Sequence, residues 1–183
     1  MKGVYIFLAD GFEEIEALTT VDVLRRAQVD AVTVSVTSCL SVEGAHGIPV
    51  VSDMILEGQD LEDADLLVLP GGMPGAKTLS ECAPLASILR KASKDGHTYI
   101  AAICAAPMVL GQLGLLKGEQ ATCYPGFEPM LIDAVTTGEM VEVSHRFITG
   151  KGPGASLDFA LTIVGEMLGQ ETKAAIASAM CHA

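Results

Sequence analysis

Short apolar segments alternate with helical segments along this chain, and this alternation constrains the fold more than any other feature. Residues 4–9, 31–36, 65–69 and 98–103 are apolar runs rich in β-forming residues. Apolar strands that alternate with helices are typical of a parallel sheet whose two faces are both covered by helices. We therefore predict an α/β fold with a mostly parallel sheet between two layers of helices.

Two regions depart from this alternation. Residues 41–52 contain Gly44, Gly47 and Pro49 and predict a hairpin or an excursion of the chain. Residues 135–149 predict an antiparallel pair broken at Gly138 and around His145. A short strand is also expected over residues 120–123. The predicted helices are residues 13–27, 79–94, 105–116, 153–168 and 171–179.

Length and charge narrow the possibilities further. The chain has 183 residues, of which 50% are hydrophobic, so we expect one compact domain over residues 1–183. Its net charge of −12 argues against nucleic acid and anionic membranes as partners. We find no targeting segment and no apolar run of the ~18 residues that a membrane span requires.

The cysteines indicate a compartment rather than a scaffold. The five residues are odd in number and irregularly spaced, without a CxxC pair, so a zinc site or disulfide framework is not expected. Free thiols fit a reducing cytosol. We predict a cytoplasmic protein with no metal and no cofactor.

Three chemically distinctive segments each follow a predicted strand. They are residues 10–16, 70–75 and 104–107. In parallel α/β sheets, ligands bind beyond the carboxyl ends of the strands. We therefore expect these segments to converge on one site.

Cys104 is the residue most suited to carry chemistry at that site. It lies at a predicted turn from strand to helix, as in a nucleophile elbow, and small residues follow it. Amide N–H groups and the helix dipole at such a turn favour a thiolate, which predicts a depressed pKa. A buried, inert cysteine is the alternative.

Two neighbouring features would complete such a site. Gly71 and Gly72 can turn backbone N–H groups toward an oxyanion, although a simple βα turn also explains them. Glu16 beside a thiolate should have a raised pKa and could move a proton. A glutamate that only stabilises the helix start is the alternative.

Together these motifs resemble the ThiJ/PfpI family, which includes the Parkinson-disease-associated protein deglycase and related bacterial proteins. Each motif alone is weak, but all occur in the family's order and the resemblance runs essentially end to end. The matching stretches are Ala9-Asp10-Gly11-Phe12-Glu13-Glu14-Ile15-Glu16, Leu69-Pro70-Gly71-Gly72, Ala101-Ala102-Ile103-Cys104-Ala105-Ala106-Pro107 and Gly152-Pro153-Gly154-Ala155-Ser156.

The resemblance implies a flavodoxin-like sandwich that is usually a homodimer. It implies Cys104 as nucleophile and oxidation-sensitive thiol, and Glu16 as its protonated partner. The amides of Gly72 and Ala105 would form an oxyanion hole. Further residues expected near the pocket, each with a structural alternative, are Gly71, Tyr124, His46, Arg26 and Pro153.

Two departures from the family pattern affect the expected activity. Peptidase-like members have histidine directly after the cysteine, where this chain has Ala105. Deglycase-like members often have histidine in a Thr-x-His-Pro segment, where this chain has Tyr124. Neither route to a Cys–His dyad is present, and a tyrosine with its usual pKa of ~10 is a poor base at neutral pH.

Three functions follow, in decreasing order of support. The first is a cysteine-dependent, cofactor-free stress-response enzyme of the glyoxalase or deglycase type, which acts on reactive carbonyls or glycated proteins through Cys104 and Glu16. The second is an oxidation-sensing redox chaperone without turnover. The third is an amidase or peptidase, which Ala105 disfavours.

Overall fold

A seven-stranded sheet forms the centre of the protein, in the order β10-β11-β7-β6-β1-β2-β5. The computed structural model describes residues 3–59, 61 and 63–182. Every neighbouring pair in this sheet is parallel except β10–β11. The strands are β1 (Val4–Leu8), β2 (Ala31–Ser35), β5 (Met54–Ile55), β6 (Leu66–Leu69), β7 (Tyr99–Ile103), β10 (Val141–Ser144) and β11 (Phe147–Gly150).

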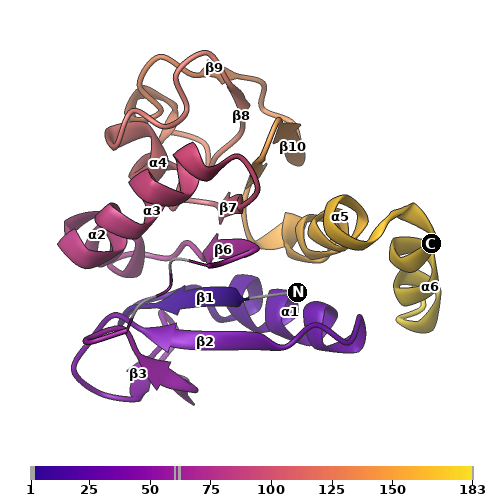
Figure 1. Ribbon diagram of the computed structural model, residues 1–183, viewed down its shortest axis with the longest axis horizontal. Coiled ribbons are helices and arrows are strands. Elements are labelled where there is room, and N and C mark those ends of the chain that lie inside the picture. The colour runs from indigo at the N-terminus through magenta and orange to yellow at the C-terminus, as the bar shows by residue number, and fades with distance from the viewer. Residues whose placement is uncertain (1–2, 60, 62, 183) are drawn as a thin grey trace.

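Helices cover the sheet in two groups. Helix α1 packs against α5 and α5 against α6, whereas α2 contacts α3 and α4. Figure 1 shows β1, β6 and β7 between the group of α2, α3 and α4 and the group of α5 and α6. The helices are α1 (Glu14–Arg26), α2 (Gly75–Glu81), α3 (Ala83–Asp95), α4 (Pro107–Gln112), α5 (Ser156–Leu168) and α6 (Gln170–Ala179).

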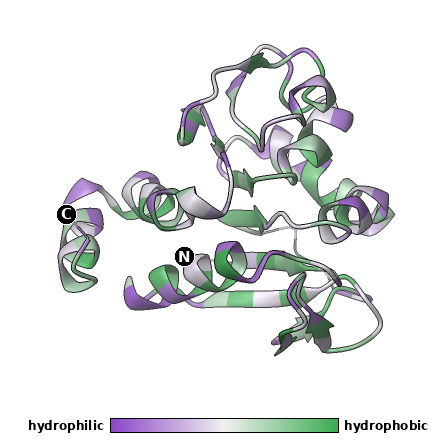
Figure 2. Ribbon diagram, turned by 180° about the vertical axis from the view of Figure 1, so that it is seen from behind, coloured by the Kyte–Doolittle hydropathy of each residue, from purple (hydrophilic) through white to green (hydrophobic). Residues whose placement is uncertain are grey.

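The central strands are apolar on both faces because both faces are covered. All four residues of β6 are buried, as are the last four of β7. Figure 2 shows the hydrophobic colour on the central strands and more hydrophilic colour on the helices. This confirms the predicted α/β, flavodoxin-like sandwich with a mostly parallel sheet.

The two irregular regions were predicted in outline. Strands β3 (Ser41–Glu43) and β4 (Pro49–Val51) form the expected hairpin. The antiparallel pair is β10–β11, and it turns at His145, whose φ is +51°. However, β9 (Val135–Thr136) does not belong to that pair but runs parallel to β8 (Gln120–Ala121). Two short 3₁₀ helices span Glu128–Met130 and Pro153–Ala155.

Two helix predictions were wrong. The helix predicted over residues 79–94 is two helices, α2 and α3, separated at Cys82. Pro84 lies in the first turn of α3 and has no N–H to continue the preceding helix. The helix predicted over residues 105–116 is only α4, because it begins at Pro107 and the chain turns at Gly114 with φ +71°.

The connections place the three expected segments side by side. The chain passes from β1 to β2 on one side and later to β6 on the other side of β1, so the strand order reverses beside β1. Strands β1, β6 and β7 are neighbours, and their carboxyl ends lead to the segments of Glu16, Gly71 and Cys104. This reversal is where doubly wound folds bind ligands. Within the described residues, no helix is long and apolar enough to cross a membrane.

Candidate active site

Cys104 lies at a strained turn directly after β7. Its φ is +65°, a left-handed conformation that costs a non-glycine residue about 1–3 kcal/mol and that often occurs at functional sites. The turn is fixed on both sides, because the Cys104 N–H donates to the Gly150 oxygen and the Tyr124 N–H donates to the Cys104 oxygen, each at 2.8 Å. Cys104 is 8% exposed, so only a small reactant reaches its sulfur directly.

Gly71 brings Glu16 and Cys104 together. Its N–H donates to Oε2 of Glu16 at 2.7 Å. A Cβ at this position would lie 2.6 Å from Cβ of Cys104 and 2.8 Å from Oε2 of Glu16. Only glycine allows the backbone to approach both side chains so closely. The structure thus confirms that Glu16, Gly71 and Cys104 converge.

Burial is the main cause that raises the pKa of Glu16 to about 7, and the negative charge of Glu13 contributes to the increase. The hydrogen bonds from the Gly71 N–H and the Cys104 side chain act in the opposite direction. Glu16 is only 1% exposed. Among the described residues, no N–H or O–H group donates to its buried Oε1 atom, and the carboxyl group interacts with the Cys104 thiol. The carboxyl therefore titrates near neutral pH, as an acid–base group for physiological chemistry should.

The depressed pKa predicted for Cys104 is not what the structure indicates. Burial raises the pKa of the thiol to about 12, and the neighbouring Glu16 carboxylate raises it too. The amide N–H groups of Gly72 and Ala105 donate to the sulfur and lower the pKa, but by less. Desolvation of the buried sulfur, which no local motif reveals, outweighs the effect of these amides on the thiol pKa. The resting group is a thiol that donates to the Glu16 carboxylate.

The two amides predicted as an oxyanion hole do lie at the sulfur. Gly72 has φ +88°, and a Cβ there would lie 2.5 Å from the Glu13 nitrogen, so the turn requires glycine. This conformation directs the Gly72 N–H toward Cys104 beside that of Ala105. An oxygen on a carbon bonded to the sulfur would lie close to both donors.

The remaining predicted pocket residues divide into near and distant ones. Tyr124 contacts Cys104 through its backbone, while its exposed ring packs edge-on against Phe127. The half-buried Pro153 begins a 3₁₀ helix just after β11. Arg26 is not brought to the site in one protomer, because it is ten residues beyond Glu16 on α1, about 15 Å at 1.5 Å per residue. It pairs with Asp22 at 2.8 Å instead.

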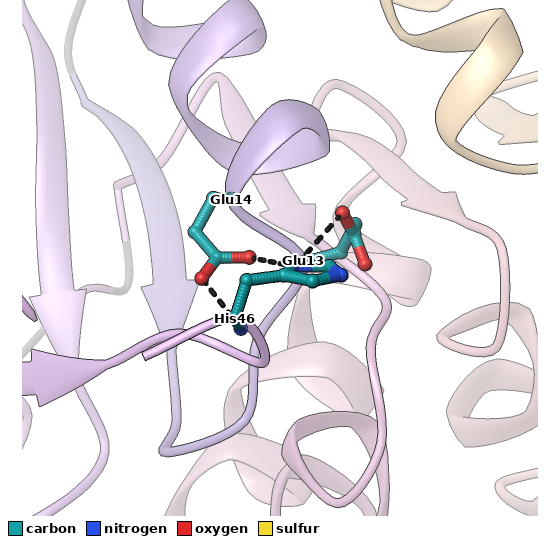
Figure 3. Close-up of side chains that lie close together, drawn as sticks. All are labelled: Glu13, Glu14 and His46. Atoms are coloured by element: carbon teal, nitrogen blue, oxygen red, sulfur yellow. Dashed lines mark hydrogen bonds and ion pairs between the residues drawn. The ribbon is translucent and has the colours of Figure 1, made fainter. Parts of the chain in front are cut away.

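His46 belongs to a second cluster, which the sequence analysis missed. Its Nδ1 lies 2.7 Å from Oε2 of Glu14 and 3.7 Å from Oε1 of Glu13 (Figure 3). Both glutamates begin α1, whereas His46 lies 32 residues beyond Glu14, in the β3–β4 loop. No local spacing signals this contact, since only the tertiary fold places the loop on the helix start.

Neither of two cavities in the described part of the chain is lined by Cys104 or Glu16. A cavity of about 700 Å³ lies between the end of β2 and α3, and Cys104 does not line it. A second cavity of about 590 Å³ is lined by Gly11, Gly44 and Met73, close to the Gly71–Gly72 turn. We assign the candidate site by its strained cysteine and its titratable pair, because cavity size alone carries no chemistry.

Comparisons with known proteins show which proteins this chain is similar to. Arabidopsis thaliana protein DJ-1 homolog B is 40% identical over 173 residues, which cover 93% of this chain and 39% of that protein. The chain spans less than half the length of the two Arabidopsis relatives it matches. The Caenorhabditis elegans protein named glutathione-independent glyoxalase DJR-1.2 is 35% identical over 177 residues, covering 93% of this chain and 91% of that protein.

A solved structure and a family model also match this chain over most of its length. The structure described as oxidized Toxoplasma gondii DJ-1 superposes with a TM-score of 0.95 at 34% identity, covering 100% of both chains. A model of the DJ-1/PfpI family matches residues 2–166. The chain therefore belongs to the DJ-1/PfpI family.

Proposed function

We propose that this protein is a cysteine-dependent glyoxalase that needs no cofactor and converts small 2-oxoaldehydes, such as methylglyoxal, into 2-hydroxy acids. The observation that carries the proposal is the pair of Cys104 and Glu16, which meet at Gly71 with a carboxyl pKa of about 7. The C. elegans relative that is named a glyoxalase supports the same chemistry.

The chemistry begins at the thiol. As the Cys104 sulfur bonds to the aldehyde carbon, the thiol proton passes to the Glu16 carboxylate, whose pKa of about 7 allows it to exchange protons near neutral pH. The aldehyde oxygen gains negative charge and accepts hydrogen bonds from the amides of Gly72 and Ala105. Glu16 then passes the proton it received to that oxygen, which gives a hemithioacetal and restores the Glu16 carboxylate.

A proton shift and hydrolysis complete the turnover. Glu16 removes the proton from the former aldehyde carbon, and the adjacent ketone carbon gains a proton, which yields a thioester of a 2-hydroxy acid. Water then cleaves the thioester and returns the Cys104 thiol. The electrons are redistributed within the substrate, so no external oxidant or reductant is needed.

The burial of Cys104 selects the size of the substrate. A cysteine that is 8% exposed is within reach of a three-carbon aldehyde more readily than of an adduct on a folded protein. Free methylglyoxal is thus better supported than a glycated protein. Peptidase activity is disfavoured because, within the residues that the structure describes, the histidines contact carboxylates rather than Cys104.

The test is consumption of methylglyoxal by purified protein without glutathione, with the product identified by NMR. We expect Cys104→Ala to abolish turnover and Cys39→Ser, which changes an exposed cysteine, to leave it intact. Undiminished turnover by Cys104→Ala would refute the mechanism.

We propose that the protein forms a homodimer and is located in the cytoplasm. The exposed apolar side chains of Ile15 and Leu18 on α1 lie within one turn of Glu16, and an interface that covers them would close the edge of the site. The five free cysteines suit a reducing compartment. Analytical ultracentrifugation of wild type and Ile15→Glu tests the dimer, which the charged variant should weaken.

Oxidation sensing is the second candidate. The amides of Gly72 and Ala105 could solvate a sulfinate on Cys104, and Oε1 of Glu16 has no other hydrogen-bond partner. The raised thiol pKa works against this function, because the thiolate is the form that oxidises. Mass spectrometry after mild peroxide should show Cys104 gaining two oxygens first; earlier oxidation of Cys39 or Cys181 would rule out a sensor.

A further inference from the structure

Three metal-ligating side chains meet at the surface beside the active site. Ligand atoms of Glu13, Glu14 and His46 all lie within 4.8 Å of one another. Nδ1 of His46 lies 2.7 Å from Oε2 of Glu14 and 3.7 Å from Oε1 of Glu13. Ligands of a tetrahedral zinc ion with bonds of ~2.0–2.1 Å lie ~3.3–3.5 Å apart, so small side-chain rotations admit an ion. Figure 3 shows the three groups directed toward one another.

The Glu14 carboxylate is already seated in position. It is buried although ionised, and a Cβ on Gly44 would overlap its carboxyl group. Its Oε1 accepts the N–H of His46 at 2.8 Å, which leaves Oε2 facing the imidazole. Because Gly44 has no side chain, the β3–β4 loop can hold the Glu14 carboxylate in place.

The loop that carries His46 is fastened to the turn between β1 and α1. The Ala45 N–H donates to the Phe12 oxygen at 2.8 Å, and the Gly11 N–H donates to the Glu43 oxygen at 2.7 Å. The main chain that carries His46 is therefore held beside the start of α1 before any ion arrives. Preorganised donors lose little conformational entropy on binding.

We propose that Glu13, Glu14 and His46 bind a divalent transition-metal ion of the zinc type. Two carboxylates balance the charge of a dication, and an imidazole nitrogen favours zinc-like metals over Mg²⁺ or Ca²⁺. His46 is 66% exposed at its side chain, so an ion reaches the site from solvent and keeps open coordination positions there. The sequence predicts no metal because the cysteines lack ligand spacing, and the 32 residues between Glu14 and His46 give no sign of this cluster.

The ion would lie near the catalytic pair without belonging to it. The Glu13 N–H donates to the Gly71 oxygen at 3.0 Å, so the cluster and the active-site turn share a stretch of main chain. Neither Cys104 nor Glu16 contributes a ligand atom to the cluster. The proposal is thus independent of the glyoxalase chemistry.

The test is titration of the full chain with Zn²⁺ by calorimetry and with Co²⁺ by visible absorption. Because the exposed Cys39 and Cys181 could bind either metal, both are replaced by serine in every sample. We expect one ion per chain and about 10–100-fold weaker binding in His46→Gln. Glu13→Gln should weaken binding as well, and it avoids disturbing the buried Glu14.

His145→Gln is the matched control. His145 is also an exposed histidine whose Nδ1 lies 2.8 Å from a carboxylate, that of Glu119, and within the described part of the chain it pairs with this single carboxylate. Its replacement should leave the affinity unchanged. Equal affinities of His46→Gln and the parent, no binding at all, or a sulfur-to-cobalt charge-transfer band would each overturn the proposal.

Discussion

Glu14 and Glu16 occupy the same first turn of α1, both are buried, and yet their carboxyl groups respond to burial in opposite ways. For Glu14, burial alone would raise the pKa, but hydrogen bonds from the His46 ring and N–H outweigh it and lower the pKa. For Glu16, burial prevails and raises the pKa to about 7. The difference lies in the donors, since Glu16 accepts one backbone N–H and interacts with a thiol.

This contrast shows that burial does not by itself decide the charge of a carboxyl group. The loop residues that cover Glu14, such as His46, are themselves exposed, so its desolvation is compensated by nearby charge and solvent. Glu16 is buried beside Gly71, whose N–H donates to Oε2, and among the described residues no N–H or O–H group donates to Oε1. One carboxylate is thus suited to hold a cation, and the other to exchange a proton.

The largest expected effect is on turnover, when each carboxylate is replaced in turn by a neutral amide. We expect Glu16→Gln to lower methylglyoxal turnover about 10²–10⁴-fold, because an amide cannot accept the thiol proton. Glu14→Gln should reduce turnover far less, since Glu14 does not contact Cys104. Steady-state kinetics measure both variants, and equal losses would erase the distinction between them.

The pH dependence of the unfolding free energy should also distinguish Glu16 from Glu14. The raised pKa of Glu16 stabilises the folded state below about pH 4.5, and this contribution of about 3 kcal/mol is lost as the pH rises through 7. Glu16→Gln should therefore gain stability relative to wild type between pH 5 and 8.5. Urea unfolding at both pH values measures the gain.

Glu14→Gln should show the opposite trend in the same experiment. The lowered pKa of Glu14 contributes stability above its ordinary value of 4.5, and that contribution is lost as the pH falls. The variant should thus be less stable than wild type at neutral pH and approach it in acid. If the difference in unfolding free energy from wild type changed with pH in the same direction for both variants, the assigned pKa shifts would be wrong.

Each carboxylate rests against its own glycine, which offers a steric test. A Cβ at Gly71 meets Cys104 and Glu16, and a Cβ at Gly44 meets Glu14. We expect each alanine variant to lose about 1–3 kcal/mol of unfolding free energy. Only Gly71→Ala should also abolish turnover, whereas only Gly44→Ala should weaken Zn²⁺ binding. Gly154→Ala, whose Cβ has no neighbour within 4 Å, is the control.

The smallest expected change concerns the thiol. Glu16→Gln removes the carboxylate that raises the pKa of Cys104, while burial remains. The thiol pKa should fall below its wild-type value of about 12 but stay above that of an exposed cysteine. Alkylation by iodoacetamide as a function of pH, followed at Cys104 by mass spectrometry, measures it. An unchanged profile would show that Glu16 does not act on the sulfur.

Much of the fold was predictable because it depends on local patterns. Apolar runs such as residues 65–69 have a period and length that specify buried parallel strands, and the hairpin over residues 41–52 is marked by its turn residues. The helix boundaries were less predictable. The break at Cys82 and the early end of α4 depend on how one proline and one glycine act within their turns.

The sequence by itself determined the α/β architecture, the position of Cys104 after a strand, and its grouping with Glu16 and the glycine turn. Tertiary structure alone decided the electrostatics. Desolvation depends on every atom packed around a group, so the raised pKa of the Cys104 thiol could not be obtained from the helix-start amides alone. Likewise, only long-range packing brings His46 to Glu14 across 32 residues, and this contact gives the two glutamates their different chemistry.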